Sequence, residues 1–203
     1  MLTIHHLRIG RSIFTVWQLE ELGIDYDLIE YHRNPETMRA PPELRDIHPL
    51  GKSPVIEDDG MILSESGAIT AYLLKKYDAD GVFGPGKGDA AWAEYTQWLH
   101  YPEGSVFSPL LMKLLSMRTG GQPLLDGFAD PEVALHFAHI SDKLGDKAFI
   151  LGDRMTGADF GITYMVSMAA TLGLLEPYPS LGAYLARNLE RSAFQRAKER
   201  AVE

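Results

Sequence analysis

The spacing of apolar side chains changes repeatedly along the first third of the chain. Short runs in which apolar and polar positions alternate predict strands, whereas apolar residues that recur about every 3.6 positions predict amphipathic helices. The helical pattern that begins near Arg11 stops at Gly23, a residue type that favours a helix C-terminus. We therefore expect a strand, a helix, a strand, a short helix, a two-stranded hairpin and a further helix. Their expected positions are Leu2–Arg8, Arg11–Leu22, Asp25–Tyr31, a few residues after Pro41-Pro42, Pro54–Ser64 and Glu65–Tyr77.

The second part of the chain carries helical patterns alone. Residues 78–88 are rich in glycine and aspartate, which is typical of a linker. The first helix beyond it should bend near Pro102, because a proline inside a helix removes a hydrogen bond. The expected helices are Asp89–Arg118, Pro131–Lys147, Thr156–Leu174, Pro179–Asn188 and Ser192–Arg200. The sequence thus predicts an α/β domain over 1–80 followed by an all-helical domain over 88–203.

The densest group of signals lies between residues 48 and 69. Ser53-Pro54 is an X-Pro bond at the start of a strand, where a cis peptide can be held. Asp59-Gly60 is typical of a hairpin turn. Glu65-Ser66 opens a helix, so backbone N–H groups and a serine hydroxyl point outward at an end that favours carboxylates. We interpret this group as a binding site for a small acidic peptide.

Composition narrows the chemistry. The chain has no cysteine, which excludes disulfides, thiolate zinc sites and a thiol nucleophile of its own, so a reacting sulfur must arrive with the substrate. Nineteen Lys and Arg against 28 Asp and Glu give a net charge of −9, which argues against a nucleic-acid partner. His5 and His6 should point to opposite faces of a strand, and His136 and His139 have no nearby carboxylate or cysteine to complete a metal site, so we expect no metal.

The same reasoning addresses the compartment. No apolar run approaches the ~20 residues of a membrane span, so we expect no membrane partner. The first residues, Met1–His6, lack the basic and apolar regions of a signal peptide. We therefore expect a cytoplasmic protein.

Several motifs resemble those of one family when they are taken in order. They are Arg39–Arg45 (RAPPELR), Ile47–Pro54 (IHPLGKSP), Tyr101–Ser105 (YPEGS) and a Thr156/Asp159 capping box at a helix start. Together with the order of elements, they make nearly the whole chain similar to the glutathione transferase family, in a branch found in bacteria and fungi. The resemblance implies a thioredoxin-like N-terminal domain that binds glutathione, an acceptor pocket between domains, and a homodimer.

The resemblance also assigns roles in glutathione binding. Glu65 and Ser66 match the pair that holds the γ-glutamyl end of the peptide. Ser53, which precedes the expected cis Pro54, matches the residue whose backbone pairs with the glutathione cysteine. Lys52 lies where a basic side chain can reach the glycine carboxylate. Each part of the tripeptide thus has an expected partner.

The sequence departs from the family at the position that activates the thiol. Many relatives in this branch carry serine where this chain has Gly10. Ser12 offers a nearby hydroxyl and Arg11 a cation, so we expect the catalytic group to be Ser12, Arg11 or the backbone amides beside them. Ser12 can donate a hydrogen bond to the sulfur and favour the thiolate, or it can simply cap the following helix.

The predicted function is that of a glutathione transferase with a role in detoxification, in which the glutathione thiolate attacks an electrophilic small molecule. A glutathione-dependent peroxidase or disulfide reductase is an alternative, and so is a binding module without chemistry. Four side chains around the Pro102 bend could line a pocket for an apolar electrophile or could be part of the helical core. They are Tyr101, Phe107, Leu111 and Met112.

Overall fold

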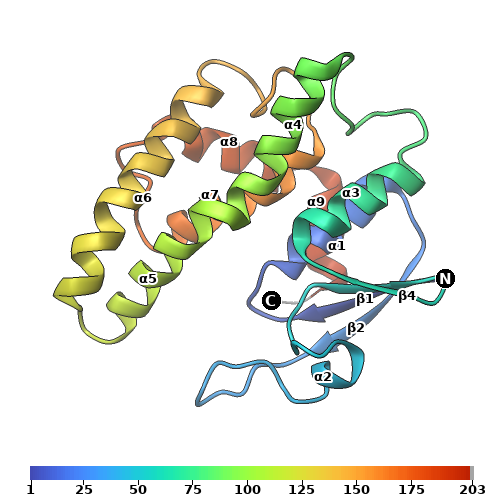
Figure 1. The fold of residues 1–203 in the computed structure, drawn as a ribbon, viewed down its shortest axis with the longest axis horizontal. Coiled ribbons are helices and arrows are strands. Elements are labelled where there is room, and N and C mark those ends of the chain that lie inside the picture. Colours follow the sequence, from blue (N-terminus) through green and yellow to red (C-terminus); the bar gives the residue numbers. More distant parts are fainter. Residues whose placement is uncertain (202–203) are drawn as a thin grey trace. The chain divides into compact units, whose positions relative to one another are not determined.

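The computed structural model describes residues 1–201, which form two compact units (Figure 1). We call the first the sheet unit; it comprises Met1–Asp80 together with 189–201. We call the second the helical unit; it comprises Gly81–Asn188. No helix within 1–201 combines the length and the apolar character that crossing a membrane requires.

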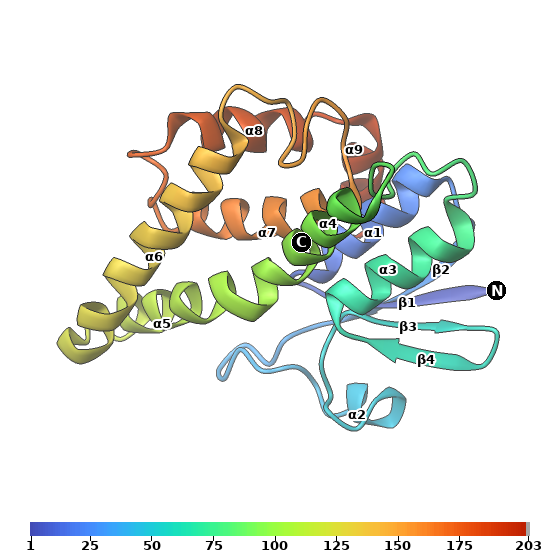
Figure 2. The same cartoon turned by 45° about the horizontal axis from the view of Figure 1, so that its top comes forward.

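The sheet unit contains one mixed sheet of four strands in the order β2-β1-β3-β4. β1 runs parallel to β2 and antiparallel to β3, and β3 and β4 form the hairpin. α1 and α3 lie on one face of the sheet and α2 lies on the other (Figures 1 and 2). This arrangement confirms the predicted order. The elements are β1 Leu2–Leu7, α1 Ser12–Leu22, β2 Tyr26–Tyr31, α2 Leu44–Ile47, β3 Val55–Asp58, β4 Met61–Ser64 and α3 Ser66–Tyr77.

The hairpin is built as the sequence predicts. Asp59 and Gly60 have φ angles of 50° and 81°, and two consecutive left-handed residues are what a tight hairpin turn requires. The preceding Asp58 is buried and accepts hydrogen bonds from Tyr72, Lys76 and Tyr77 of α3. Burial raises the pKa of Asp58, but these three donors outweigh it and hold the pKa below 3.8. An ionised carboxylate therefore fastens the hairpin to α3.

The last helix, α9 (Ser192–Arg200), packs within the sheet unit, although the sequence grouped it with the helical domain of 88–203. Its Phe194 ring lies 5.8 Å from the ring of Phe14 and 5.5 Å from that of Trp17, both on α1. The Arg191 guanidinium, just before α9, donates to both carboxylate oxygens of Glu21. Aromatic burial and a bidentate ion pair thus attach α9 to α1.

The helical unit confirms the expected all-helical character of its stretch of chain. The long helix predicted over 89–118 is interrupted at Pro102 by one π-helical segment, as expected for a residue that cannot donate to the helical ladder. The elements are α4 Asp89–Tyr101, the π-helical segment Pro102–Val106, α5 Phe107–Arg118, α6 Pro123–Leu144, α7 Gly157–Thr171 and α8 Pro179–Leu189.

The predicted start of one helix, at Pro131, is wrong. α6 begins at Pro123, so Pro131 lies inside the helix. Proline is well suited to a first helical position because its missing N–H has no helical partner there. The Gln122 N–H is satisfied by Ser116 Oγ at 2.7 Å and by Asp126 Oδ2 at 3.1 Å, which stabilises this start. A non-local contact with Ser116 therefore overrides the local signal at Pro131.

The capping box at the start of α7 is confirmed. The carboxylate of Asp159 accepts from the backbone N–H of Thr156 at 2.8 Å and from its hydroxyl at 3.1 Å. It also accepts from the Ile150 N–H at 3.0 Å and from the Tyr184 hydroxyl at 2.9 Å. Four donors on one fully buried carboxylate make this box a structural centre of the helical unit.

Candidate glutathione site

The start of β3 is tied directly to β1. The Ser53-Pro54 bond is cis, as the sequence suggested. The Ser53 hydroxyl donates to the His5 carbonyl at 2.7 Å and accepts from the Leu7 N–H at 3.1 Å. These bonds fix residues 53 and 54 beside the C-terminal end of β1. Lys52, the preceding residue, has an exposed side chain.

The start of α3 has an unusual backbone. Glu65 adopts φ 72° and ψ 114°, a combination that non-glycine residues rarely occupy. Its side chain is exposed and makes no capping hydrogen bond to the helix. The first helical residue, Ser66, is half-buried. The N-terminal N–H groups of a helix attract anions, so this end can receive a carboxylate.

A hydrogen bond connects these two segments. Ser64 Oγ lies 3.3 Å from His48 Nε2, which joins the loop before Lys52 to the residue before Glu65. The predicted glutathione residues therefore lie on two adjacent segments of the sheet unit that are connected through β1, the hairpin and this contact. Lys52, Ser53, Pro54, Glu65 and Ser66 all belong to the sheet unit, and the pairing of Val55 with Ser64 sets their two segments side by side.

The loop between β1 and α1 is shaped by an arginine that the sequence did not single out. The Arg33 Nε donates to the carbonyls of Arg8 and Ile9, each at 3.1 Å, and its Nη1 donates to the Met38 carbonyl at 3.0 Å. Ile9 is 60 % exposed and has φ 56°, which is a rare angle for a β-branched residue. No local pattern around Arg33 indicates that it reaches this loop.

Ser12 is buried, with 1 % of its surface exposed. Its hydroxyl donates to the Leu7 carbonyl at 3.2 Å, accepts from the Leu7 N–H at 3.2 Å and lies 2.9 Å from His6 Nδ1. The alternative that Ser12 caps α1 is wrong, because Arg11 occupies the N-cap position and no side chain caps this end. The role of Ser12 as a donor to sulfur stays a prediction, and it requires the hydroxyl to turn away from the Leu7 carbonyl.

The predicted acceptor residues differ in their surroundings. The Tyr101 hydroxyl lies 2.6 Å from His136 Nδ1, and its ring meets those of Trp98 and His139 edge to face. Burial raises the pKa of Tyr101. Tyr101 therefore contributes to packing between α4 and α6. The other three, Phe107, Leu111 and Met112, are half-buried, and their place in an acceptor pocket stays a prediction.

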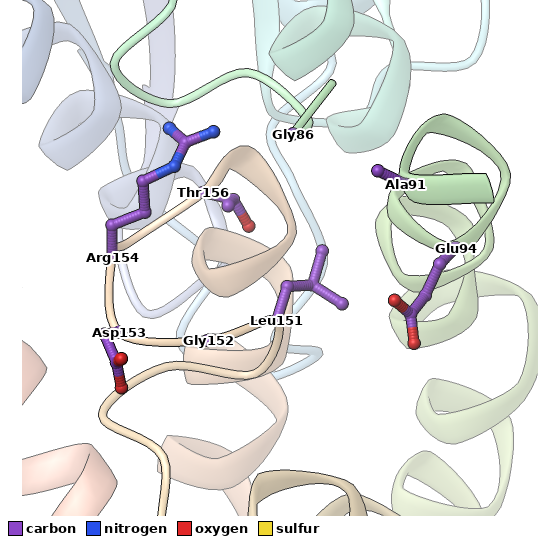
Figure 3. Close-up of a pocket in the computed structure, with 8 residues that line it drawn as sticks. All are labelled: Gly86, Ala91, Glu94, Leu151, Gly152, Asp153, Arg154 and Thr156. Carbon is purple, nitrogen blue, oxygen red and sulfur yellow. The ribbon is translucent and has the colours of Figure 1, made fainter. Parts of the chain in front are cut away.

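A separate cavity of about 440 Å³ lies within the helical unit (Figure 3). Its Arg154 donates to the carbonyls of Gly81, Val82 and Gly84, so this guanidinium holds the linker. Its Glu94 is paired with Lys143. The cavity is lined by Gly86, Ala91, Glu94, Leu151, Gly152, Asp153, Arg154 and Thr156, none of which belongs to the predicted site. Within 1–201 no cluster of three or more His, Asp or Glu side chains could hold a metal ion.

Comparison with known proteins addresses the identity of this fold. Residues 2–75 match the family described as "Glutathione S-transferase, N-terminal domain". A crystal structure of a glutathione S-transferase from Actinobacillus pleuropneumoniae is 35 % identical, with a TM-score of 0.91 over 99 % of this chain and 93 % of that one. The chain belongs to the glutathione S-transferase family.

Two further relatives of this glutathione S-transferase extend the comparison. Glutathione S-transferase 3 of Schizosaccharomyces pombe is 29 % identical over 98 % of this chain and 88 % of the relative. A glutathione transferase homolog from Lodderomyces elongisporus, solved with two GSH per subunit, shares the fold at 20 % identity. Its TM-score is 0.85 over 98 % of this chain and 97 % of that one. The matched residues 2–75 contain every residue predicted to bind glutathione.

Proposed function

We propose that this protein conjugates the thiolate of glutathione to an apolar electrophile. The observation that carries the proposal is the pairing of Val55 with Ser64 across the hairpin, which sets Ser53-Pro54 beside the uncapped start of α3 at Glu65. One offers fixed backbone groups beside β1, and the other offers a helix end that favours a carboxylate. The full-length similarity to proteins named glutathione S-transferases supports the same ligand.

Each part of glutathione has a partner in this proposal. Glu65 binds the γ-glutamyl amine, and Ser66 with the first N–H groups of α3 binds the γ-glutamyl carboxylate. The backbone at Ser53 pairs with the cysteine, and Lys52 reaches the glycine carboxylate. The sulfur then lies near the loop between β1 and α1, because Ser53 is bonded to His5 and Leu7 at the end of β1.

The chemical step is a nucleophilic attack by sulfur. A free thiol has a pKa near ~8.5, so it must be stabilised as the thiolate to react at neutral pH. Ser12, Arg11 and the backbone N–H groups at the start of α1 are the proposed stabilising groups. The thiol proton passes to water, sulfur forms a bond to the electrophilic carbon, and the leaving group departs with its electron pair. Binding both reactants together lowers the entropic cost of their meeting.

One observation favours a second candidate, a binding module without chemistry. Gly10 supplies no hydroxyl at the position where many relatives carry serine, and the Ser12 hydroxyl is engaged inside the protein. Such a module would bind glutathione without turning it over. Conjugation of glutathione to an aryl halide would identify a transferase, whereas turnover of a peroxide or a disulfide with glutathione would identify a peroxidase or a reductase. Any of these activities would rule out the binding module.

Isothermal titration with glutathione tests the binding site. We expect saturable binding that Ser66→Ala weakens roughly ten- to a hundredfold, because a charge-assisted hydrogen bond contributes ~1.5–3 kcal/mol. Ser108→Ala, at an exposed position of α5, is the matched control and should bind as the natural chain does. No heat and no thermal shift at millimolar glutathione would refute the proposed function.

We also propose that the protein is a homodimer that acts in the cytoplasm in detoxification, with neither nucleic acid nor membrane as a partner. The dimer is supported by the family membership and by the general rule that closed two-fold dimers are the commonest soluble oligomers. Light scattering should give a mass near twice that of the 22.6 kDa chain. A mass near that of one chain at micromolar concentration would contradict the dimer.

A further inference from the structure

Arg33 holds the loop that leaves β1 in an unusual conformation. Non-glycine residues with positive φ in the described part of the chain are Ile9, Met38, Asp59 and Glu65. The Arg33 guanidinium donates to the carbonyls of two of them, Ile9 and Met38, at 3.1 and 3.0 Å. Backbone in such regions persists only where surrounding contacts impose it. The protein therefore places this guanidinium at the cost of strain in two segments.

The absence of a side chain at Gly10 leaves space for the Arg33 guanidinium. A Cβ at residue 10 would stand 3.1 Å from Arg33 Nη2 and 3.1 Å from the Leu7 carbonyl oxygen, both tighter than ordinary carbon contacts. Gly10 is not among the glycines with positive φ, so its backbone conformation does not require glycine. What requires the missing side chain is the close approach of these neighbours. The guanidinium thus occupies the region into which a side chain at position 10 would extend.

We propose that Arg33 stabilises the glutathione thiolate in this protein, in the place of a hydroxyl at position 10. This inference rests on the proposed function, which puts the sulfur beside the loop between β1 and α1. The Ser53 hydroxyl bonds to the Leu7 N–H, and the Arg33 guanidinium bonds to the carbonyl of the next residue, Arg8, so both side chains are held at the C-terminal end of β1.

The chemistry of arginine suits this role. A guanidinium stays protonated at all physiological pH values, and its bonds to neutral carbonyls leave its positive charge in place. A cation beside a thiolate favours the charged form and lowers the thiol pKa. The other charged side chains of this loop are Arg8, whose guanidinium is 2.6 Å from Glu30, and Arg11. What distinguishes Arg33 is its position, because its guanidinium lies 3.1 Å from where the Cβ of residue 10 would stand.

The test measures the pKa of bound glutathione by the ultraviolet absorbance of its thiolate, on the full chain and on single variants. Arg33→Gln keeps a hydrogen-bond donor but removes the charge, and it should raise the bound thiol pKa by about 1–2 units. At a pH below the thiol pKa of the natural chain, turnover of Arg33→Gln should then fall about tenfold or more. Arg33→Lys keeps the charge but cannot form the three-carbonyl fork, and it should retain most of the lowered pKa. Arg118→Gln, on the exposed end of α5, is the matched control for loss of one arginine charge.

The outcomes separate this proposal from the proposed function. If the natural chain fails to bind glutathione, both are wrong. If it binds and Arg33→Gln leaves the thiol pKa unchanged, the function stands and the role of Arg33 is refuted. If Gln and Lys variants raise the pKa equally, Arg33 acts only by shaping the loop, which also overturns the proposal. A pKa that rises in Arg11→Gln but not in Arg33→Gln would assign the role to Arg11 instead.

Discussion

Glu65 offers the sharpest test of the proposed binding site, because we expect its Cβ to affect stability and its carboxylate to affect glutathione binding. Its φ of 72° and ψ of 114° place the Cβ in a crowded backbone conformation. The side chain is exposed and makes no capping bond that would compensate for it. Conformations of this kind cost about 1–3 kcal/mol, and they gather at functional sites. We infer that Glu65 is kept here for ligand binding and not for stability.

Replacing Glu65 by glycine should therefore stabilise the protein. Removal of the Cβ relieves the strain of about 1–3 kcal/mol, and the greater freedom of glycine in the unfolded chain takes back about 0.5–1 kcal/mol. The net gain is therefore about 0–2.5 kcal/mol, with a central value of about 1 kcal/mol. For a chain of this size each kcal/mol moves the thermal midpoint by about 2–4 °C, so the midpoint should rise by a few degrees.

The same variant should lose affinity for glutathione. Without the Glu65 carboxylate the ammonium group of the γ-glutamyl end lacks its partner, which should weaken binding roughly ten- to a hundredfold. Glu65→Gln is the matched control, because it keeps the Cβ and removes only the charge. It should weaken binding to a similar extent without raising the midpoint. Differential scanning calorimetry and isothermal titration measure the two effects on the same samples.

Two results would contradict this reasoning. A lower midpoint for Glu65→Gly would mean that the side chain stabilises the start of α3 through contacts that outweigh its strain. Unchanged glutathione affinity in both Glu65→Gly and Glu65→Gln would remove Glu65 from the binding site. A midpoint that rises equally in both variants would show that the carboxylate charge, and not the Cβ, causes the instability.

Three further changes probe the scaffold. Asp58→Asn should lower the thermal midpoint by about 4–8 °C at neutral pH, since hydrogen bonds to a charged group contribute ~2 kcal/mol. Because folding lowers the pKa of Asp58, the stability it contributes is complete above the unfolded pKa of 3.8 and is lost as pH falls through the folded pKa. A difference in midpoint between Asp58→Asn and the natural chain that grows in acid would refute this reasoning. Asp159→Ala leaves four donors without an acceptor and should cost at least about 3 kcal/mol in urea unfolding, so a loss below about 1 kcal/mol would be inconsistent. Tyr101→Phe removes the hydrogen bond to His136 but keeps the ring, and should lower the midpoint by about 2–4 °C. An unchanged midpoint would show that this hydrogen bond does not stabilise the fold.

The parts of the fold that the sequence predicted depend on local chemistry. Asp59-Gly60 specifies its turn because two adjacent residues must accept positive φ, and both residue types do so readily. The Thr156/Asp159 box specifies a helix start because both partners lie within one turn. Pro102 interrupts its helix because the missing N–H is its own. In each case the deciding atoms are within a few residues of one another.

The predictions that failed or fell short depend on distant contacts. The start of α6 moved from Pro131 to Pro123 because Ser116, on another helix, satisfies the Gln122 N–H. The alternative that Ser12 caps α1 failed because its hydroxyl bonds instead to His6 and Leu7 at the end of β1. Residue spacing predicts that such groups belong to the same segment, but it does not predict the direction in which a hydroxyl points.

The candidate site also combines residues that a local sequence pattern indicates with residues that only a distant contact brings in. Glu65 and Ser66 could be found from sequence because a helix start has a local pattern, whereas Arg33 reaches the loop of Gly10 from 23 residues further along the chain. Neither Gly10 nor Arg33 is informative alone, since a glycine without positive φ and an arginine in a loop are both ordinary. The information lies in their pairing, in which a missing side chain and a guanidinium 3.1 Å from the position of its Cβ occur together. Arg33 bonds to the carbonyls of Ile9 and Met38, two residues with a strained backbone, so the pairing is kept at a cost in conformational free energy. Backbone strain of this kind gathers at functional sites, which favours a functional explanation over one from folding alone.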